Sequence, residues 1–249
     1  MEYNYKITIN YDGGRYEGWQ RQKNRLTIQE TLEKCIGKIC KEEVKVIASG
    51  RTDAGVHALA QTANFHTTAK LKLKEFVREC NEVLPEDIRI TVAQEVENEF
   101  HSRYDAVEKI YCYTLDTRKR PNVFTRRYAY SVAEDLNVQE MKRAALLLEG
   151  NHDFRSFTSE KRKDKDTVRN VTSITIVEEK GYLKLYFQGE GFLYHMVRIL
   201  TGTLIEIGLG KKNVEEVPEI FRAKNRFRAG FMAPAHGLML MKVIYANEK

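Results

Sequence analysis

The sequence predicts an α+β fold, because segments with strand periodicity alternate with segments that have helical periodicity. The first half of the chain has the order strand, helix, strand, strand, helix, strand, and the second half repeats this order. That order is the ferredoxin-like split motif, β-α-β-β-α-β. We therefore predict two ferredoxin-like domains, residues 1–104 and 105–249, which share a topology without a convincing sequence repeat.

The elements of the first half follow from apolar periodicity and from helix-end signals. Strands are expected at residues 3–11, 44–48, 61–66 and 88–94, and helices at residues 28–39 and 73–84. Thr27 with Glu30 has the spacing of a capping box at the start of the first helix. Pro85 is expected to end the second helix, since proline lacks the N–H that a helix interior needs.

The second half has the same kinds of signal. Strands are expected at residues 110–115, 171–177, 182–187 and 238–245, and helices at residues 136–148 and 192–204. Gly181 marks a hairpin turn between the second and third of these strands. The charged segment 158–166 lacks apolar periodicity, so we expect a mobile surface loop there.

Composition favours a polyanionic partner. The chain has 41 Lys and Arg against 35 Asp and Glu, which gives a net charge of +6. The four cysteines form no C-x-x-C pair and are expected to be buried free thiols. Because the sequence has no signal peptide and no apolar run of membrane-spanning length, we expect a cytoplasmic protein.

Residues 50–57, Gly-Arg-Thr-Asp-Ala-Gly-Val-His, connect two expected strands. Glycines at both ends allow a tight turn and a close approach to other backbone. On residue types alone, a plain hairpin turn is the commoner explanation for such a segment. As a whole, however, the eight residues resemble the signature of the TruA-type tRNA pseudouridine synthases, in which the aspartate is the nucleophile.

The resemblance to this family extends over nearly the whole chain. It includes Tyr11-Asp12-Gly13 with Tyr16, Gly18, Gln20 and Gln22; Asn81 with Leu84-Pro85 and Asp87-Ile88; Phe100-His101-Ser102-Arg103-Tyr104 with Tyr111 and Tyr113; Gly150 to Phe154; Phe192 to Arg198; and Ala233 to Leu238. It implies two halves joined side by side into one long, mainly antiparallel sheet with helices on one face. It also implies a basic cleft between the halves, and a homodimer that extends the RNA surface.

The activity implied by the resemblance is isomerisation of uridine to pseudouridine in the anticodon stem-loop, at tRNA positions thirty-eight to forty. This reaction needs no cofactor and no metal, and the sequence has no phosphate-binding loop, dinucleotide fingerprint or metal cluster. The implied partner is tRNA, with no membrane and no small-molecule cofactor.

The resemblance also implies roles for four residues. Asp53 would act at C1′ of the uridine, or take a proton from C2′, and the sequence leaves both routes open. Arg198 is the candidate for the cation that keeps Asp53 ionised. Arg51 resembles the residue that guides the flipped base, and Tyr111 the residue that packs against it. Tyr113 is a competitor for that packing role, because residues two apart share a strand face.

Other interpretations remain open at this point. His57 and His66 lack further ligands for a metal, so we assign both to structure. The basic stretches at residues 118–120 and 222–228 interleave with aromatic residues, which suits RNA but also suits a core flanked by surface cations. A non-catalytic RNA-binding module, a nucleoside hydrolase that uses Asp53, and a family member acting on another RNA are the alternatives.

Overall fold

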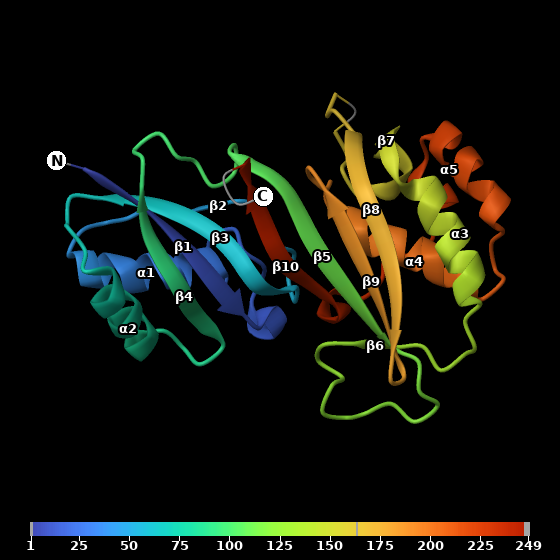
Figure 1. Ribbon diagram of the computed structural model, residues 1–249, viewed down its shortest axis with the longest axis horizontal. Helices are drawn as coiled ribbons and strands as arrows, with labels where there is room; N and C mark the ends of the chain where they lie inside the picture. Colours follow the sequence, from blue (N-terminus) through green and yellow to red (C-terminus); the bar gives the residue numbers. More distant parts are fainter. Residues whose placement is uncertain (1, 163, 247–249) are drawn as a thin grey trace. The chain divides into compact units, whose positions relative to one another are not determined.

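The computed structural model describes residues 2–162 and 164–246. It divides into two compact units, which are described separately (Figure 1). The first unit contains the described residues up to 107 and from 239 onward, and the second contains residues 108–238. The last strand is thus grouped with the first unit, whereas the predicted domains placed it in the second half. The α+β fold class is confirmed.

The first unit is built on a sheet in which β1 (Tyr3–Tyr11) lies between β3 (His57–Thr67) and β4 (Ile88–Val96). Strand β1 is antiparallel to both neighbours. Strand β10 (Leu238–Tyr245) pairs with β3 in parallel, and β2 (Ile47–Ala48) pairs with β3 antiparallel. The core of this unit lies along β1, where every second side chain from Tyr5 to Tyr11 is buried.

Two helices pack with this sheet, α1 (Ile28–Cys40) and α2 (Leu73–Val83). The ring of Phe76 on α2 lies 5.7 Å from that of Phe65 on β3, centroid to centroid. The predicted capping box is wrong, because the side chain of Thr27 makes no capping hydrogen bond. The first N–H groups of α1 donate instead to the carbonyls of Gly18 and Trp19, so the segment before the helix satisfies them.

The strand predicted at residues 44–48 is reduced to Ile47–Ala48. The reason is that side chains of α1 bond the backbone of Val46. Its carbonyl accepts from Gln29 Nε2 at 3.0 Å, and its N–H donates to Glu33 Oε1 at 3.2 Å. These bonds replace the ladder that a longer strand would have made.

The second unit has a sheet of antiparallel neighbours in the order β5 (Ala106–Asp116), β9 (Tyr182–Gly189), β8 (Val168–Glu179) and β7 (Gly150–Asp153). Short strand β6 (Tyr130–Ser131) pairs with β5 in parallel. The predicted hairpin turn is confirmed, because Lys180 and Gly181 both have positive φ between β8 and β9.

Helices α3 (Val138–Leu148), α4 (Met196–Gly208) and α5 (Val217–Ala223) complete the second unit. Helix α3 contacts α4, α5 and β8, so these helices pack together beside the sheet (Figure 1). Helix α4 begins four residues later than predicted, since His195 has a left-handed φ of 63° just before it. Strand β7 and helix α5 were not predicted from the sequence.

The described residues also bear on three further expectations. All four cysteines, Cys35, Cys40, Cys80 and Cys112, are buried free thiols, as predicted. No helix in the described part of the chain is long and apolar enough to cross a membrane. The predicted charged loop at residues 158–166 contains no helix or strand among its described positions, and residue 163 lies outside the described residues.

Candidate active site

Arg51 and Asp53 lie on the loop that leads from β2 to β3 in the first unit. Arg51 is exposed and Asp53 is half-buried. The loop has no helix or strand of its own between Ser49 and Val56, so contacts with other segments must set its shape. Asp53 is thus partly accessible, and the backbone that carries it is bonded to a neighbouring segment.

The loop is held by residues 11–19, the last residue of β1 and the stretch that follows it, which we call the holding segment. The N–H of Trp19 donates to the carbonyl of Thr52 at 3.0 Å, and the hydroxyls of Tyr11 and Thr52 lie 2.8 Å apart. The N–H of Gly55 donates to the carbonyl of Tyr16 at 3.3 Å. These bonds fix the residue before Asp53 and the second residue after it, so the chain around Asp53 has little freedom.

Two glycines let the holding segment approach the loop closely. A Cβ on Gly13 would lie 2.0 Å from the carbonyl oxygen of Val56, well inside van der Waals contact. Gly18 has a φ of +86°, and a Cβ there would lie 2.7 Å from the carbonyl oxygen of Thr52. Glycine is therefore needed at both positions for the loop to keep this shape.

A buried polar network supports the start of the loop. Gln61 on β3 donates from Nε2 to the carbonyl of Gly50 at 2.9 Å, and its Oε1 accepts from the hydroxyl of Ser49 at 2.8 Å. The same Nε2 also lies 3.4 Å from the hydroxyl of Tyr11. Burial raises the pKa of Tyr11 to about 12, so this hydroxyl stays protonated at neutral pH.

His57 closes the loop at its other end. The imidazole is buried, and its Nδ1 lies 3.1 Å from the N–H nitrogen of Gly13 and 3.0 Å from Oδ1 of Asp12. These contacts tie the first residue of β3 to the holding segment. The arrangement fits the structural role expected for His57, and no group of His, Cys, Asp and Glu in the described residues could hold a metal ion.

Tyr111 and Tyr113 share one face of β5 in the second unit, but their surroundings differ. Tyr111 is 8% exposed, and its ring is nearly perpendicular to that of Phe192 at a centroid distance of 5.4 Å. Tyr113 is fully buried, and its hydroxyl donates to the carbonyl of Pro234 at 2.8 Å. Burial also raises the pKa of Tyr113. Its ring packs so tightly against Gly237 that a Cβ there would lie 2.6 Å from it.

Arg198 lies in the first turn of α4 and is 9% exposed, so it is not the surface arginine that a basic helix face would carry. Its Nε donates to the carbonyl of Ala233 at 2.8 Å, and the N–H of Ala233 donates back to the carbonyl of Arg198 at 3.1 Å. Burial lowers the pKa of His236, and the charge of Arg198 adds to this shift. A guanidinium held in this way is a fixed positive charge.

Of the four predicted site residues, Arg51 and Asp53 share one loop of the first unit, whereas Tyr111 lies on β5 and Arg198 on α4 of the second unit. Sequence reasoning missed the residues that hold the loop, above all Thr52 and Gln61. The matched motif did contain the Tyr11 and Gly13 positions, but nothing in the sequence indicated which residues they contact.

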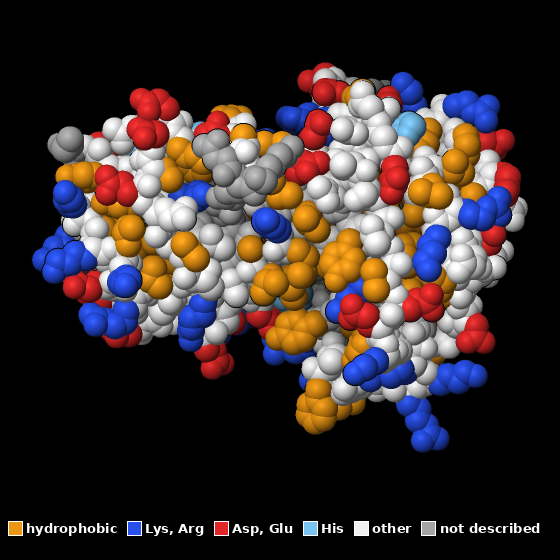
Figure 2. Space-filling view, viewed as in Figure 1, with side chains coloured by type: hydrophobic (Ala, Val, Ile, Leu, Met, Phe, Trp, Pro, Cys, Tyr) orange, Lys and Arg blue, Asp and Glu red, His pale blue; other side chains and the backbone are white. Residues whose placement is uncertain are grey.

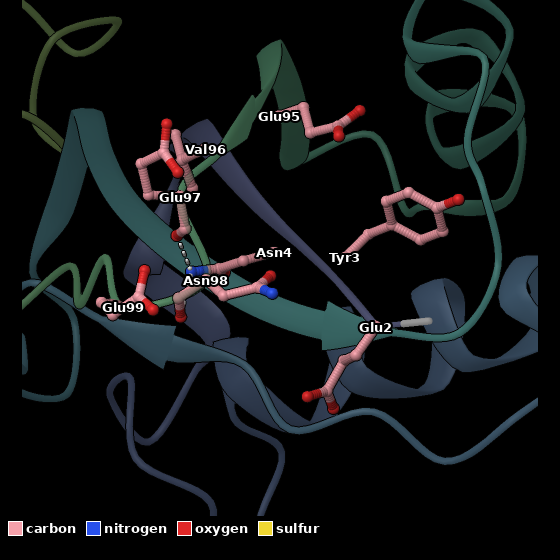
Figure 3. Close-up of a pocket in the computed structure, with 8 residues that line it drawn as sticks. All are labelled: Glu2, Tyr3, Asn4, Glu95, Val96, Glu97, Asn98 and Glu99. Carbon is pink, nitrogen blue, oxygen red and sulfur yellow. Dashed lines mark hydrogen bonds between the residues drawn. The ribbon is translucent and has the colours of Figure 1, made fainter.

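A separate hollow of about 280 Å³ lies elsewhere on the first unit (Figure 3). It is lined by Glu2, Tyr3, Asn4, Glu95, Val96, Glu97, Asn98 and Glu99. These residues lie at the N-terminal end of β1, whereas the Asp53 loop is held at the opposite end by Tyr11. The four glutamates would repel a phosphate backbone, so this hollow does not fit an RNA site.

Comparisons with known proteins show the family to which the chain belongs. The model of the tRNA pseudouridine synthase family matches residues 7–105 and 144–246, and the first of these segments contains the whole Asp53 loop. The matched segments cover most of the chain. The chain therefore belongs to the tRNA pseudouridine synthases, a family of isomerases, as the sequence motifs indicated.

Individual relatives are similar over nearly their full length. The chain is 44% identical over 242 residues to tRNA pseudouridine synthase A of a Thermoanaerobacter species, covering 97% of this chain and 99% of the relative. It is 43% identical over 247 residues to tRNA pseudouridine synthase A 2 of Clostridium tetani, covering 98% and 100%. Among solved structures, a chain of a Cbf5-Nop10-Gar1 complex gives a TM-score of 0.34 at 14% identity, covering 94% of this chain and 57% of that one. That last similarity is too weak to add to the assignment.

Proposed function

We propose that this enzyme isomerises uridine to pseudouridine in the anticodon stem-loop of tRNA, at positions thirty-eight to forty, with Asp53 as the nucleophile. The observation that supports the catalytic role of Asp53 is the fixation of its loop by hydrogen bonds on both sides of the aspartate. A catalytic group must be held close to its productive geometry, and supporting hydrogen bonds do this best. A plain hairpin turn needs no such support.

The reaction breaks the N1–C1′ bond, turns the uracil and joins its C5 to C1′. The proton on C5 is released to water and N1 takes up a proton, so the product is an isomer of the substrate. A carboxylate suits the electron-poor C1′ that develops when the glycosidic bond breaks. Asp53 either attacks C1′ or takes a proton from C2′. In both routes it must be ionised, and we propose that Arg198 supplies the neighbouring cation, since a buried guanidinium keeps its charge.

A uridine stacked in RNA must leave its stack before Asp53 can reach it, at a cost of a few kcal/mol. We assign to the exposed Arg51 the role of entering the space that the base leaves. We assign to Tyr111 the role of packing against the flipped uracil. Its competitor Tyr113 is fully buried and donates its hydroxyl to Pro234, which favours Tyr111 for contact with substrate.

We also propose that the enzyme works as a homodimer in the cytoplasm, needs no cofactor, and binds tRNA through a basic cleft. The net charge of +6 supports a polyanionic substrate. Binding should weaken steeply as salt concentration rises, because phosphate contacts release counterions. An affinity for tRNA that does not change with salt would contradict the basic cleft.

The target position is tested by mapping pseudouridine in unmodified tRNA transcripts after incubation with the enzyme. We expect new pseudouridines at positions thirty-eight to forty in transcripts that have uridine there. A transcript in which those uridines are replaced by cytidine is the matched control and should gain none. Pseudouridine at other positions, with none in the anticodon arm, would overturn the proposed target while leaving the isomerase assignment intact.

A further inference from the structure

Residues 117–129, which lead from β5 to β6, form a long connection that we call the tip loop. It contains five cations, Arg118, Lys119, Arg120, Arg126 and Arg127, and no acidic residue. The tip loop lies between the two segments that match the family model, 7–105 and 144–246. The roles proposed for Asp53, Arg51, Tyr111 and Arg198 leave it without a function.

Large apolar side chains stand exposed on this loop. Phe124 is 86% exposed and Val123 is 61% exposed, although both are large enough to stabilise a core. Figure 2 shows lysine and arginine side chains beside apolar groups along its lower edge, where Figure 1 draws the connection from β5 to β6. An exposed aromatic ring surrounded by positively charged side chains is typical of a surface that binds nucleic acid.

The base of the tip loop is rigidly built. Asp116 accepts hydrogen bonds from Nε and Nη2 of Arg118 at 2.8 and 2.6 Å, and from the N–H of Asn122 at 3.2 Å. The bonds from Arg118 hold the pKa of Asp116 below its usual range, so the pair stays charged. Arg118 also lies over the ring of Tyr182, 4.4 Å from its centroid. Arg118 is therefore a structural cation, and the other four remain at the surface.

The turn that presents Phe124 is equally well defined. The N–H of Phe124 donates to Oδ1 of Asn122 at 2.9 Å, and the N–H of Thr125 donates to the carbonyl of Asn122 at 3.1 Å. The hydroxyls of Thr125 and Tyr182 lie 3.1 Å apart, which ties the turn to β9. The ring is thus presented on an ordered turn, so little conformational entropy is lost when it binds.

We propose that the tip loop is an RNA-docking element separate from the catalytic residues. In this proposal Phe124 stacks on an unpaired base of the tRNA, and Lys119, Arg120, Arg126 and Arg127 contact the adjacent phosphates. The inference rests on the proposed function, because that function supplies tRNA as the ligand. A contact between the tip loops of two copies is a poorer alternative, since it would bring the same cations together.

Binding of a tRNA transcript to Phe124 variants tests the proposal. Phe124→Ala and Phe124→Leu should each weaken binding about tenfold, within the range for loss of one aromatic–base stack. Phe124→Tyr keeps the stacking ring and should bind like the native chain. Equal binding by the alanine, leucine and native chains would overturn the proposal. The leucine variant isolates the effect of the ring, because leucine keeps apolar area and loses only the aromatic ring.

Leu146 provides a control for exposed apolar area, since it is 68% exposed and lies on helix α3. Leu146→Ala should bind tRNA like the native chain. An equal loss from both alanine variants would show that affinity follows exposed apolar area rather than the tip loop. A change in sedimentation mass of Phe124→Ala with unchanged tRNA affinity would show that the loop joins two copies, and would also overturn the proposal.

A tryptophan at this position gives a direct optical readout. The chain has one tryptophan, Trp19, which is 2% exposed. The fluorescence that the new tryptophan adds in Phe124→Trp is the difference between the emission of the variant and that of the native chain. Stacking on a base should quench this added fluorescence when tRNA saturates the protein. Unquenched emission at saturation would contradict stacking.

Turnover separates this inference from the proposed function. Phe124→Ala should raise KM for tRNA and leave kcat at saturating tRNA unchanged, because the tip loop takes no part in the chemistry. If the native chain binds tRNA but forms no pseudouridine, the proposed function fails and the binding comparison still decides the docking role. If the native chain forms pseudouridine while Phe124→Ala has native affinity and KM, the docking role fails alone.

Discussion

The hydroxyl of Tyr11 lies 2.8 Å from the hydroxyl of Thr52, so the end of strand β1 holds the residue that precedes Asp53. This contact spans 41 positions of sequence. It explains why a tyrosine at the end of the first strand and an aspartate signature far along the chain occur in one motif set. The strand provides the support, and the loop provides the carboxylate.

Removing this hydroxyl should reduce turnover. In Tyr11→Phe, Thr52 and Gln61 lose a buried hydrogen-bond partner, so the Asp53 loop gains freedom. We expect kcat to fall about tenfold with little change in tRNA affinity, since small misplacements of a catalytic group are costly. Tyr16→Phe is the control, because the Tyr16 hydroxyl bonds Asp87 instead of the loop. An equal loss in both variants would remove the special role of the Tyr11 contact.

Close packing against the loop predicts a strong effect of one added methyl group. A Cβ at Gly13 would lie 2.0 Å from the carbonyl oxygen of Val56, so Gly13→Ala must displace the loop. We expect activity to fall at least about tenfold and stability to drop by about 1–3 kcal/mol. Gly191→Ala is the matched control, since a Cβ there has no atom within 4 Å. Thermal unfolding and pseudouridine formation measure the two effects.

Substitution of the two tyrosines of β5 should have different effects, on stability for Tyr113 and on catalysis for Tyr111. Tyr113→Phe loses the bond to Pro234 and should cost about 1 kcal/mol of stability with kcat retained. Tyr111→Leu should lower kcat about a hundredfold, because a branched chain cannot replace a ring packed on uracil. Urea unfolding and single-turnover assays distinguish them. Full activity in Tyr111→Leu with lost activity in Tyr113→Phe would reverse the assignment.

Stability should fall at alkaline pH because of buried tyrosines. Burial raises the pKa of Tyr11 and of Tyr16 to about 12, above the usual value of 10.0. Below pH 10 both states keep these protons, so the contribution is fully present. Between about pH 10 and 12 the unfolded chain releases them first, and the folded state loses stability as pH rises. Urea unfolding of Tyr11→Phe should show a shallower decline over this range than the native chain.

Most elements could be predicted from the sequence because each has an apolar face of the right period. Both ends of strand β1 and of helix α2 were predicted to within one residue. The predicted strand at 44–48 failed because Gln29 and Glu33 bond the backbone of Val46, and sequence periodicity does not show such side-chain contacts. Strand β7 and helix α5 are too short, at 4 and 7 residues, to display a period.

The candidate site was predictable only in part. The signature around Asp53 indicated the loop and its aspartate through resemblance to a family. The supports of that loop were not predictable, because Gly13 and Val56, or Gln61 and Gly50, meet only after the chain has folded. Likewise, Tyr111 and Tyr113 share one strand face, and the bond from Tyr113 to Pro234 that fixes Tyr113 in the core forms only in the folded chain.

The most direct test is release of tritium from a tRNA transcript labelled at C5 of uridine. Joining C5 to C1′ expels that hydrogen, so release into water measures the isomerisation itself. The native chain should release tritium, whereas Asp53→Asn, which keeps the shape and removes the charge, and Asp53→Ala should release none. Unchanged tRNA affinity in both variants would show that they remain folded and bind substrate. Equal release by the native chain and either variant would contradict the role of Asp53.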